Sequence, residues 1–232
     1  NVLTTMPHLL RALPVRGPSV SFPHQAPCCS LSLGMPGGPP ERCLDPRVPR
    51  GVDGAVILSP HGTRLARAAA RLPAPVAFVG DPDVPGLPFV DLDQVRAARL
   101  ATQRLLDRGC TRIATVTGPL DMPAGAGRRQ GFVAALRGAG RRAVAALPGD
   151  FTLEGGAAAA DLLLATHPDV DGIFVASDLM AAGVVQALLR AGRRVPDDVA
   201  VVGFDDAVIA RQTVPALTTM TNPAHELARR AA

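Results

Sequence analysis

The chain has 232 residues and a mass of 23.9 kDa, with 47% hydrophobic and 19% charged residues. This composition excludes a disordered tail and a disulfide-dense miniprotein, and it allows one large domain or two small ones. The formal net charge is +4, and most of the excess lies in the first 50 residues, which hold five arginines and two acidic residues. Because the rest of the chain is nearly neutral, its charge gives no support for nucleic-acid binding.

Residues 1–50 contain ten prolines, which prevent any helix longer than about two turns. The segment shows neither a helical nor a strand periodicity. It is a Pro-rich segment to which we assign no structure.

From residue 51 onward, short apolar runs alternate with amphipathic segments, as strands and helices do. Residues 52–58 and 76–79 predict strands on either side of a short helix at 64–72. A well-marked surface helix follows Asp93 and stops at Gly109. We expect the later strands at 113–117, 144–147, 172–176 and 199–202, and the later helices around 128–139, 154–165 and 181–191. This alternation predicts an α/β fold with a parallel sheet and helices on both faces.

The cysteines and the apolar runs of the sequence predict a cytoplasmic protein. No zinc-ligand spacing links Cys28, Cys29, Cys43 or Cys110, so we expect no metal site and reduced thiols. No apolar run reaches about 18 residues, and the N-terminus shows no export signal.

In parallel sheets, ligands bind beyond the carboxyl ends of the strands. Four predicted strands are followed by polar or small residues: Gly118-Pro119, Asp150-Phe151, Ser177-Asp178 and Asp205-Asp206. Asp178 also stands where a helix begins, so it is a helix cap or a ligand contact. Asp206 could likewise cap a short turn. Asp205 has no such local role and is our preferred ligand acceptor.

Two near-motifs, one for dinucleotide binding and one for nucleophilic catalysis, are incomplete. The glycines at 125, 127 and 131 resemble a dinucleotide-binding loop, but the last interval is one residue too long and no acidic residue ends the following strand. Ser59 and His61 lie together, yet no nucleophile elbow surrounds the serine. We therefore expect no enzyme and no cofactor.

Several strings of the sequence resemble the effector-binding core of LacI/GalR bacterial transcription regulators. The strings Gly-Val-Asp-Gly-Ala-Val-Ile, Leu-Leu-Asp-Arg-Gly-Cys-Thr-Arg-Ile-Ala and Arg-Arg-Gln-Gly-Phe stand at 51–57, 105–114 and 128–132. More specific are Ala-Ser-Asp-Leu-Met-Ala at 176–181, Val-Pro-Asp-Asp-Val-Ala-Val-Val-Gly-Phe-Asp-Asp at 195–206, and Pro-Ala-Leu-Thr-Thr at 215–219. Together they extend the resemblance over residues 51–232.

The resemblance implies a two-lobed fold like that of periplasmic sugar-binding proteins, with a small polar effector, a sugar or a nucleoside-like molecule, held between the lobes of a homodimer. It assigns residues 51–92 and 218–232 to an N-terminal lobe and 93–217 to a C-terminal lobe. It also implies that Arg128 and Asp205 hydrogen-bond the effector, that Phe151 stacks on it, and that Ser177 lines the pocket. Asp178, next to Ser177, remains a candidate effector-binding residue. Of two adjacent arginines, we expect Arg129 to be the exposed one.

Three departures from the family pattern carry expectations of their own. We find no counterpart of the family's DNA-reading headpiece, so operator binding is expected only through a segment absent from this sequence. The sequence also stops at Ala232, where we expect the family's last strand and helix still to follow. Residues 1–50 stand where the family opens its N-terminal lobe but look unlike it, and we hypothesise that they are a frame-shifted or atypical start. We accordingly expect the N-terminal lobe to be incomplete.

The function predicted from the sequence is the effector-sensing domain of a LacI-type regulator. Two alternatives stay open. A sugar-binding protein of a transport system shares the fold but would need an export signal, and an enzyme on a doubly wound sheet would need a nucleophile, a base or a cofactor loop.

Overall fold

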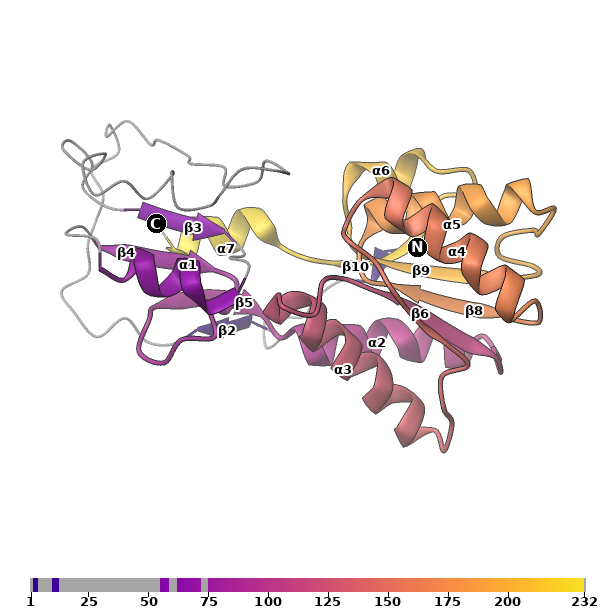
Figure 1. The fold of residues 1–232 in the computed structure, drawn as a ribbon, viewed down its shortest axis with the longest axis horizontal. Coiled ribbons are helices and arrows are strands. Elements are labelled where there is room, and N and C mark those ends of the chain that lie inside the picture. Colours follow the sequence, from indigo (N-terminus) through magenta and orange to yellow (C-terminus); the bar gives the residue numbers. More distant parts are fainter. Residues whose placement is uncertain (1, 4–9, 13–54, 59–61, 72–74, 232) are drawn as a thin grey trace. The chain divides into compact units, whose positions relative to one another are not determined.

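The computed structural model describes residues 2–3, 10–12, 55–58, 62–71 and 75–231 (Figure 1). Ser59, His61 and most of the Pro-rich segment lie outside the described residues. The chain divides into two compact units. The larger unit consists of residues 1–9, 93–120 and 124–223, and the smaller unit of residues 10–92, 121–123 and 224–232.

The larger unit is built on a six-stranded sheet in which every pair of neighbouring strands is parallel. Its strands are, in sheet order, β1 (Val2–Leu3), β10 (Thr218–Thr221), β9 (Ala200–Asp205), β8 (Gly172–Val175), β6 (Ile113–Thr117) and β7 (Ala146–Pro148). Its helices are α2 (Gln94–Asp107), α3 (Pro123–Gly138), α4 (Leu153–Thr166), α5 (Asp178–Arg190) and the short α6 (Val208–Gln212). Figure 1 shows α2 and α3 on one face of this sheet and α4 and α5 on the other. The predicted α/β fold is confirmed.

Helices on both faces explain why the central strands are buried throughout. Every residue of β6 and of β8 is buried. On the face covered by α2 and α3, three phenylalanines form a continuous row. Phe132 of α3 stacks on Phe174 of β8 with ring centroids 6.0 Å apart, and Phe174 meets Phe204 of β9 edge-on at 6.5 Å. This row leads from the core toward the carboxyl end of β9.

The helices of the larger unit end where glycine allows a left-handed turn. Gly109 has φ +90°, its N–H donates to the carbonyl of Leu106, and the next N–H, from Cys110, donates to that of Leu105. This pair of bonds satisfies carbonyls that the end of α2 would leave unpaired. Gly140 after α3 and Gly192 after α5 have the same arrangement. The three helix ends predicted from these glycines are confirmed.

The smaller unit contains a four-stranded sheet with a small core. Its strands are, in sheet order, β2 (Leu10–Ala12), β5 (Phe89–Leu92), β4 (Val76–Val79) and β3 (Ala55–Leu58), and only the β2–β5 pair is antiparallel. Its helices are α1 (Gly62–Ala69) and α7 (Ala224–Ala231). Ile57, Phe78 and two alanines of α1 form the buried cluster, and α7 packs on β4 and β5 through buried Leu227. Among the helices described in the two units, none is long and apolar enough to cross a membrane.

Several elements differ from the sequence-based expectation. The strands β5 and β10 were not predicted, because an aspartate or threonines interrupt their apolar pattern. The helices α6 and α7 were not predicted either. The segment assigned no structure contains β1 and β2, which stand apart from its prolines. Residues 218–221, expected in the N-terminal lobe, pair with β9 and therefore belong to the larger unit, so the chain crosses after Pro223 rather than at residue 218.

Candidate functional site

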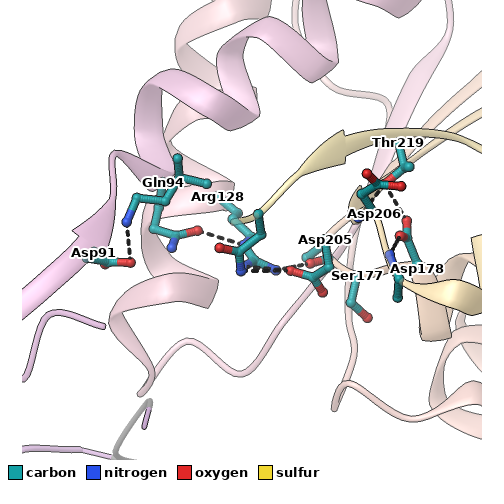
Figure 2. A network of polar contacts seen from close by, with 12 residues as sticks. Asp91, Gln94, Arg128, Ser177, Asp178, Asp205, Asp206 and Thr219 are labelled. Atoms are coloured by element: carbon teal, nitrogen blue, oxygen red, sulfur yellow. Dashed lines mark hydrogen bonds and ion pairs between the residues drawn. The ribbon is translucent and has the colours of Figure 1, made fainter. Parts of the chain in front are cut away.

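Arg128 is the centre of a buried polar network in the larger unit (Figure 2). It lies on the first half of α3 and is only 4% exposed, whereas the adjacent Arg129 is exposed, as expected. Its Nε donates to Oε1 of Gln94 at 2.9 Å, its Nη1 donates to the carbonyl of Ala176 at 2.5 Å, and its Nη2 lies 3.1 Å from Oδ1 of Asp205. These contacts use three of the five N–H donors of the guanidinium group.

Two aromatic rings lie beside this guanidinium group. The central carbon of the guanidinium lies 3.8 Å from the ring centroid of Phe204, the last ring of the row described above, and 5.9 Å from that of Phe151. Both are within the range of a cation–π interaction. Phe151 is half-buried, has φ +66° and lies against Gly118, where a Cβ would come within 2.2 Å of the ring. The strand-end residues Gly118 and Phe151 therefore do meet.

Asp205 ends β9 with one carboxylate oxygen engaged. Its Oδ1 receives Nη2 of Arg128 and, at 3.3 Å, the side-chain amide of Asn222. Its Oδ2 accepts no hydrogen bond from the described residues, and 32% of the side chain remains exposed. Asp205 has φ +109° and the next residue, Asp206, has φ +55°, so both adopt backbone conformations that favour glycine. The carboxylate is thus presented by a strained turn.

Asp206 faces away from Arg128. Its Oδ1 forms an ion pair with Arg211 of α6 at 2.9 Å, and its Oδ2 accepts from the hydroxyl of Thr221 at 3.4 Å. It does not cap α6, whose N-cap is Ala207 with no side-chain cap bond. Asp206 therefore ties α6 to β10.

The helix cap that the sequence left open for Asp178 is made by Ser177. Ser177 is the N-cap of α5, because its Oγ accepts from the N–H of Met180 at 3.3 Å. Asp178 is the first helical residue and is fully buried. Its Oδ1 accepts from the hydroxyl of Thr219 at 2.6 Å and its Oδ2 accepts from the N–H of Ala207 at 2.8 Å. Burial, followed by nearby carboxylates, raises the pKa of Asp178 to about 6.

The structure therefore brings together Arg128, Asp205 and Phe151, with Ser177 one residue beyond the carbonyl that holds the arginine. The pattern of the sequence missed Gln94, Phe204 and Asn222. The only sequence signal for Gln94 was its place beside the helix cap Asp93, whose side chain accepts from the N–H of Arg96.

The comparisons with known proteins agree on a family. Residues 102–232 match the model of a periplasmic binding protein-like domain. The transcriptional regulator CelR of Thermobifida fusca is 40% identical over 205 residues, which are 86% of this chain and 60% of that protein. The chain therefore spans less than two thirds of this relative.

Solved structures give the same result. The complex of the regulator CelR with cellobiose has a TM-score of 0.76 at 39% identity and covers 83% of this chain and 61% of that one. A LacI-family regulator from Burkhoderia phymatum has a TM-score of 0.77 at 31% identity, over 85% and 75% of the two chains. A lac repressor dimer bound to operator and an anti-inducer has a TM-score of 0.70 at 27% identity, over 77% and 55%.

The fold, the strand-end site and these similarities define an effector-binding domain of the periplasmic binding protein-like class. The chain belongs to the LacI family of transcriptional regulators. Because these relatives are named as regulators, the alternative of a transport-system binding protein is set aside.

Proposed function

We propose that this chain is the effector-sensing part of a LacI-type regulator and that it binds a small sugar at Arg128 and Asp205. The observation that carries the proposal is their ion pair. Arg128 is buried and held on three sides, while Asp205 keeps a free oxygen and partial exposure. A carboxylate with an unused acceptor beside a fixed guanidinium group matches the paired hydroxyls of a sugar.

The two charged groups divide the work of recognition. Oδ2 of Asp205 accepts a hydrogen bond from one sugar hydroxyl, while an unused N–H of Arg128 donates to the oxygen of a neighbouring hydroxyl. Neither bond requires the ion pair at Oδ1 to break. Phe151, half-buried beside the guanidinium group, offers a ring face to the apolar side of the sugar.

The choice of a sugar over a nucleoside is supported by the relative solved with cellobiose, which is 39% identical to this chain over the aligned residues. Asp178, which is fully buried and satisfied by protein donors, is left out of the proposed contact set.

In this proposal the sugar acts through linkage. It binds one conformation of the domain better than another, and the difference in affinity changes how tightly the whole regulator binds operator DNA. We propose a homodimer, as in the related lac repressor dimer, acting in the cytoplasm, with operator contacts made by a separate DNA-reading segment. The larger unit would supply the sugar contacts named here.

A thermal-shift screen of the full chain tests this function. Cellobiose, further mono- and disaccharides and a set of nucleosides are added separately, and the melting temperature is recorded. We expect at least one sugar to raise it, a greatly reduced shift for Asp205→Asn, and a retained shift for Asp198→Asn, which affects only surface contacts with the side chain and the backbone N–H of Arg194. The proposal fails if no sugar stabilises the wild type, or if Asp205→Asn keeps the full shift.

A further inference from the structure

The buried carboxylate of Asp178 lies directly behind the turn that presents Asp205 (Figure 2). One of its oxygens accepts the N–H of Ala207, the residue that follows the turn. Its other oxygen accepts the hydroxyl of Thr219 on β10. No part of Asp178 is exposed, so both oxygens are committed to the protein.

Through the hydroxyl of Thr219, the carboxylate of Asp178 also acts on the backbone N–H of Asp206. An ionised carboxylate only accepts hydrogen bonds, so the hydroxyl of Thr219 must point its proton at Asp178. Its lone pairs are then free to accept the N–H of Asp206, which lies 3.3 Å away. Asp178 thus fixes two successive backbone N–H groups, that of Ala207 directly and that of Asp206 through Thr219.

The N–H of Asp206 lies in the strained part of the backbone, and that of Ala207 directly follows it. Asp205 and Asp206 both have positive φ, and such conformations persist only where neighbouring groups hold them. The same turn aims Oδ1 of Asp205 at Arg128 and leaves Oδ2 free. The direction of the Asp205 carboxylate therefore depends on what holds the turn.

The sequence of β9 makes room for this arrangement. A Cβ at Gly203 would lie 2.2 Å from Oδ1 of Asp178, a distance that no real contact shows. Only glycine at this position lets the carboxylate lie against the strand that ends in Asp205.

We propose that Asp178 is a positioning residue, which fixes the turn after β9 and thereby aims Asp205 at Arg128 and at the ligand. It touches no ligand itself. The inference rests on the proposed function for its binding readout, and it deepens that function by naming what holds the ligand-binding carboxylate in place.

The variant Asp178→Asn tests this role in the full chain, with cellobiose, or whichever sugar the thermal-shift screen selects, as the probe. If the NH₂ group faces Ala207, the N–H of Ala207 loses its acceptor; if it faces Thr219, it donates to the hydroxyl, whose own proton then loses its acceptor. At pH 8, we expect isothermal titration calorimetry to show the sugar binding at least tenfold more weakly. Thr219→Val, which removes the hydroxyl and keeps the shape, should act in the same direction if Asp178→Asn does not fold. Unchanged affinity in the folded variants would overturn the inference.

Asp171→Asn is the matched control. Asp171 also ties a loop of the larger unit, accepting the N–H groups of Thr111 and Arg112 and the hydroxyl of Thr111. The substitution Asp171→Asn should lower the melting temperature but leave the affinity for the sugar unchanged. If Asp171→Asn weakens binding as much as Asp178→Asn, the effect is general destabilisation and the inference is wrong.

A double variant separates positioning from a merely structural role. If Asp178 acts through Asp205, adding Asp178→Asn to Asp205→Asn should cause little further loss of affinity. If the loss of affinity in the double variant equals the product of the two single losses, Asp178 acts on binding independently of Asp205, and the inference is overturned.

The crystal structure of Asp178→Asn gives a readout that needs no ligand. We expect the carboxylate of Asp205 to have left Nη2 of Arg128 and the backbone at 205–206 to have changed. An unchanged turn would overturn the inference even if the wild type binds sugars well. If no sugar binds the wild type but the turn moves, the proposed function fails while the positioning role of Asp178 stands.

Discussion

A buried arginine on a helix needs compensation for its lost hydration, and Arg128 receives it from several directions. An amide oxygen, a backbone carbonyl and a carboxylate accept its N–H groups, and the ring of Phe204 covers its face. A solvent-facing helix arginine would need none of these contacts. The side chain is therefore held in one orientation before any ligand arrives, which lowers the entropic cost of binding.

Replacing Arg128 with lysine should weaken sugar binding. Lysine keeps the charge but loses the planar fork and the fit over Phe204. We expect the dissociation constant measured by calorimetry to rise at least tenfold, which corresponds to about 1.4 kcal/mol. Arg129→Lys, on the exposed neighbour, should leave binding unchanged. Equal affinities for the wild type and Arg128→Lys would remove Arg128 from the site.

Asp178 should also give stability a pH dependence. Its pKa is raised to about 6 from the ordinary 3.8, so between these values the folded protein holds a proton that the unfolded chain has released. Stability then falls as the pH rises from about 4 to about 6. Asp205 and Asp206 face this carboxylate, with Arg128 and Arg211 paired to them in turn.

Urea unfolding of the wild type and Asp178→Asn across this range checks the sign. Relative to the variant, the wild type should lose about 1 to 3 kcal/mol of its free energy of unfolding between pH 4 and pH 6.5. Parallel curves for the two proteins, or a wild type that gains stability with pH, would show that Asp178 is not a desolvated carboxylate.

Some residues of the site could be predicted from the sequence, and others could not. The resemblance to a family named Arg128, Phe151 and Asp205, which the fold does bring together. The partners of Asp178 could not be predicted, because Thr219 is 41 residues away and Ala207 is 29. A carboxylate at a helix start suggests a cap, and only the packed fold shows that Ser177 caps the helix and Asp178 turns inward.

At the scale of elements, glycine marked the helix ends better than any other signal. It did so because a left-handed residue is needed where α2, α3 and α5 turn back toward the sheet. The strands were predictable where both faces are covered, as in β6 and β8. The strands β5 and β10 were not, because an aspartate in one and threonines in the other interrupt the apolar pattern, and their place comes from pairing with neighbouring strands.

The substitution Gly109→Ala tests the role of these helix ends. The position has φ +90° and nothing lies within 4 Å of an added Cβ, so the cost is backbone strain alone. We expect a loss of about 1 kcal/mol in the free energy of unfolding, measured with urea.

Gly138→Ala is the opposite control for this helix-end test. It lies in α3 without a positive φ, and its Cβ would meet only the end of Arg99 at 4.0 Å. Alanine favours the helix, so this variant should be neutral or stabilised by up to about 1 kcal/mol. Equal effects at the two positions would contradict the assignment of Gly109 to a left-handed turn.

At the scale of the whole molecule, the alternation of strands and helices was enough to predict a parallel sheet, and the resemblance was enough to predict the family. Both are confirmed. The resemblance assigned residues from 218 onward to the N-terminal lobe, whereas in the fold β10 extends the large sheet next to β9. The hypothesis about residues 1–50 stays a prediction, which translation of the gene in all frames would test.

A crystal structure of the full chain with cellobiose, or with the sugar selected by the thermal-shift screen, shows whether Arg128 and Asp205 bind a sugar. We expect sugar hydroxyls within hydrogen-bond distance of Oδ2 of Asp205 and of a terminal nitrogen of Arg128, with a sugar face against Phe151. A sugar bound with neither charged group in contact would contradict this expectation.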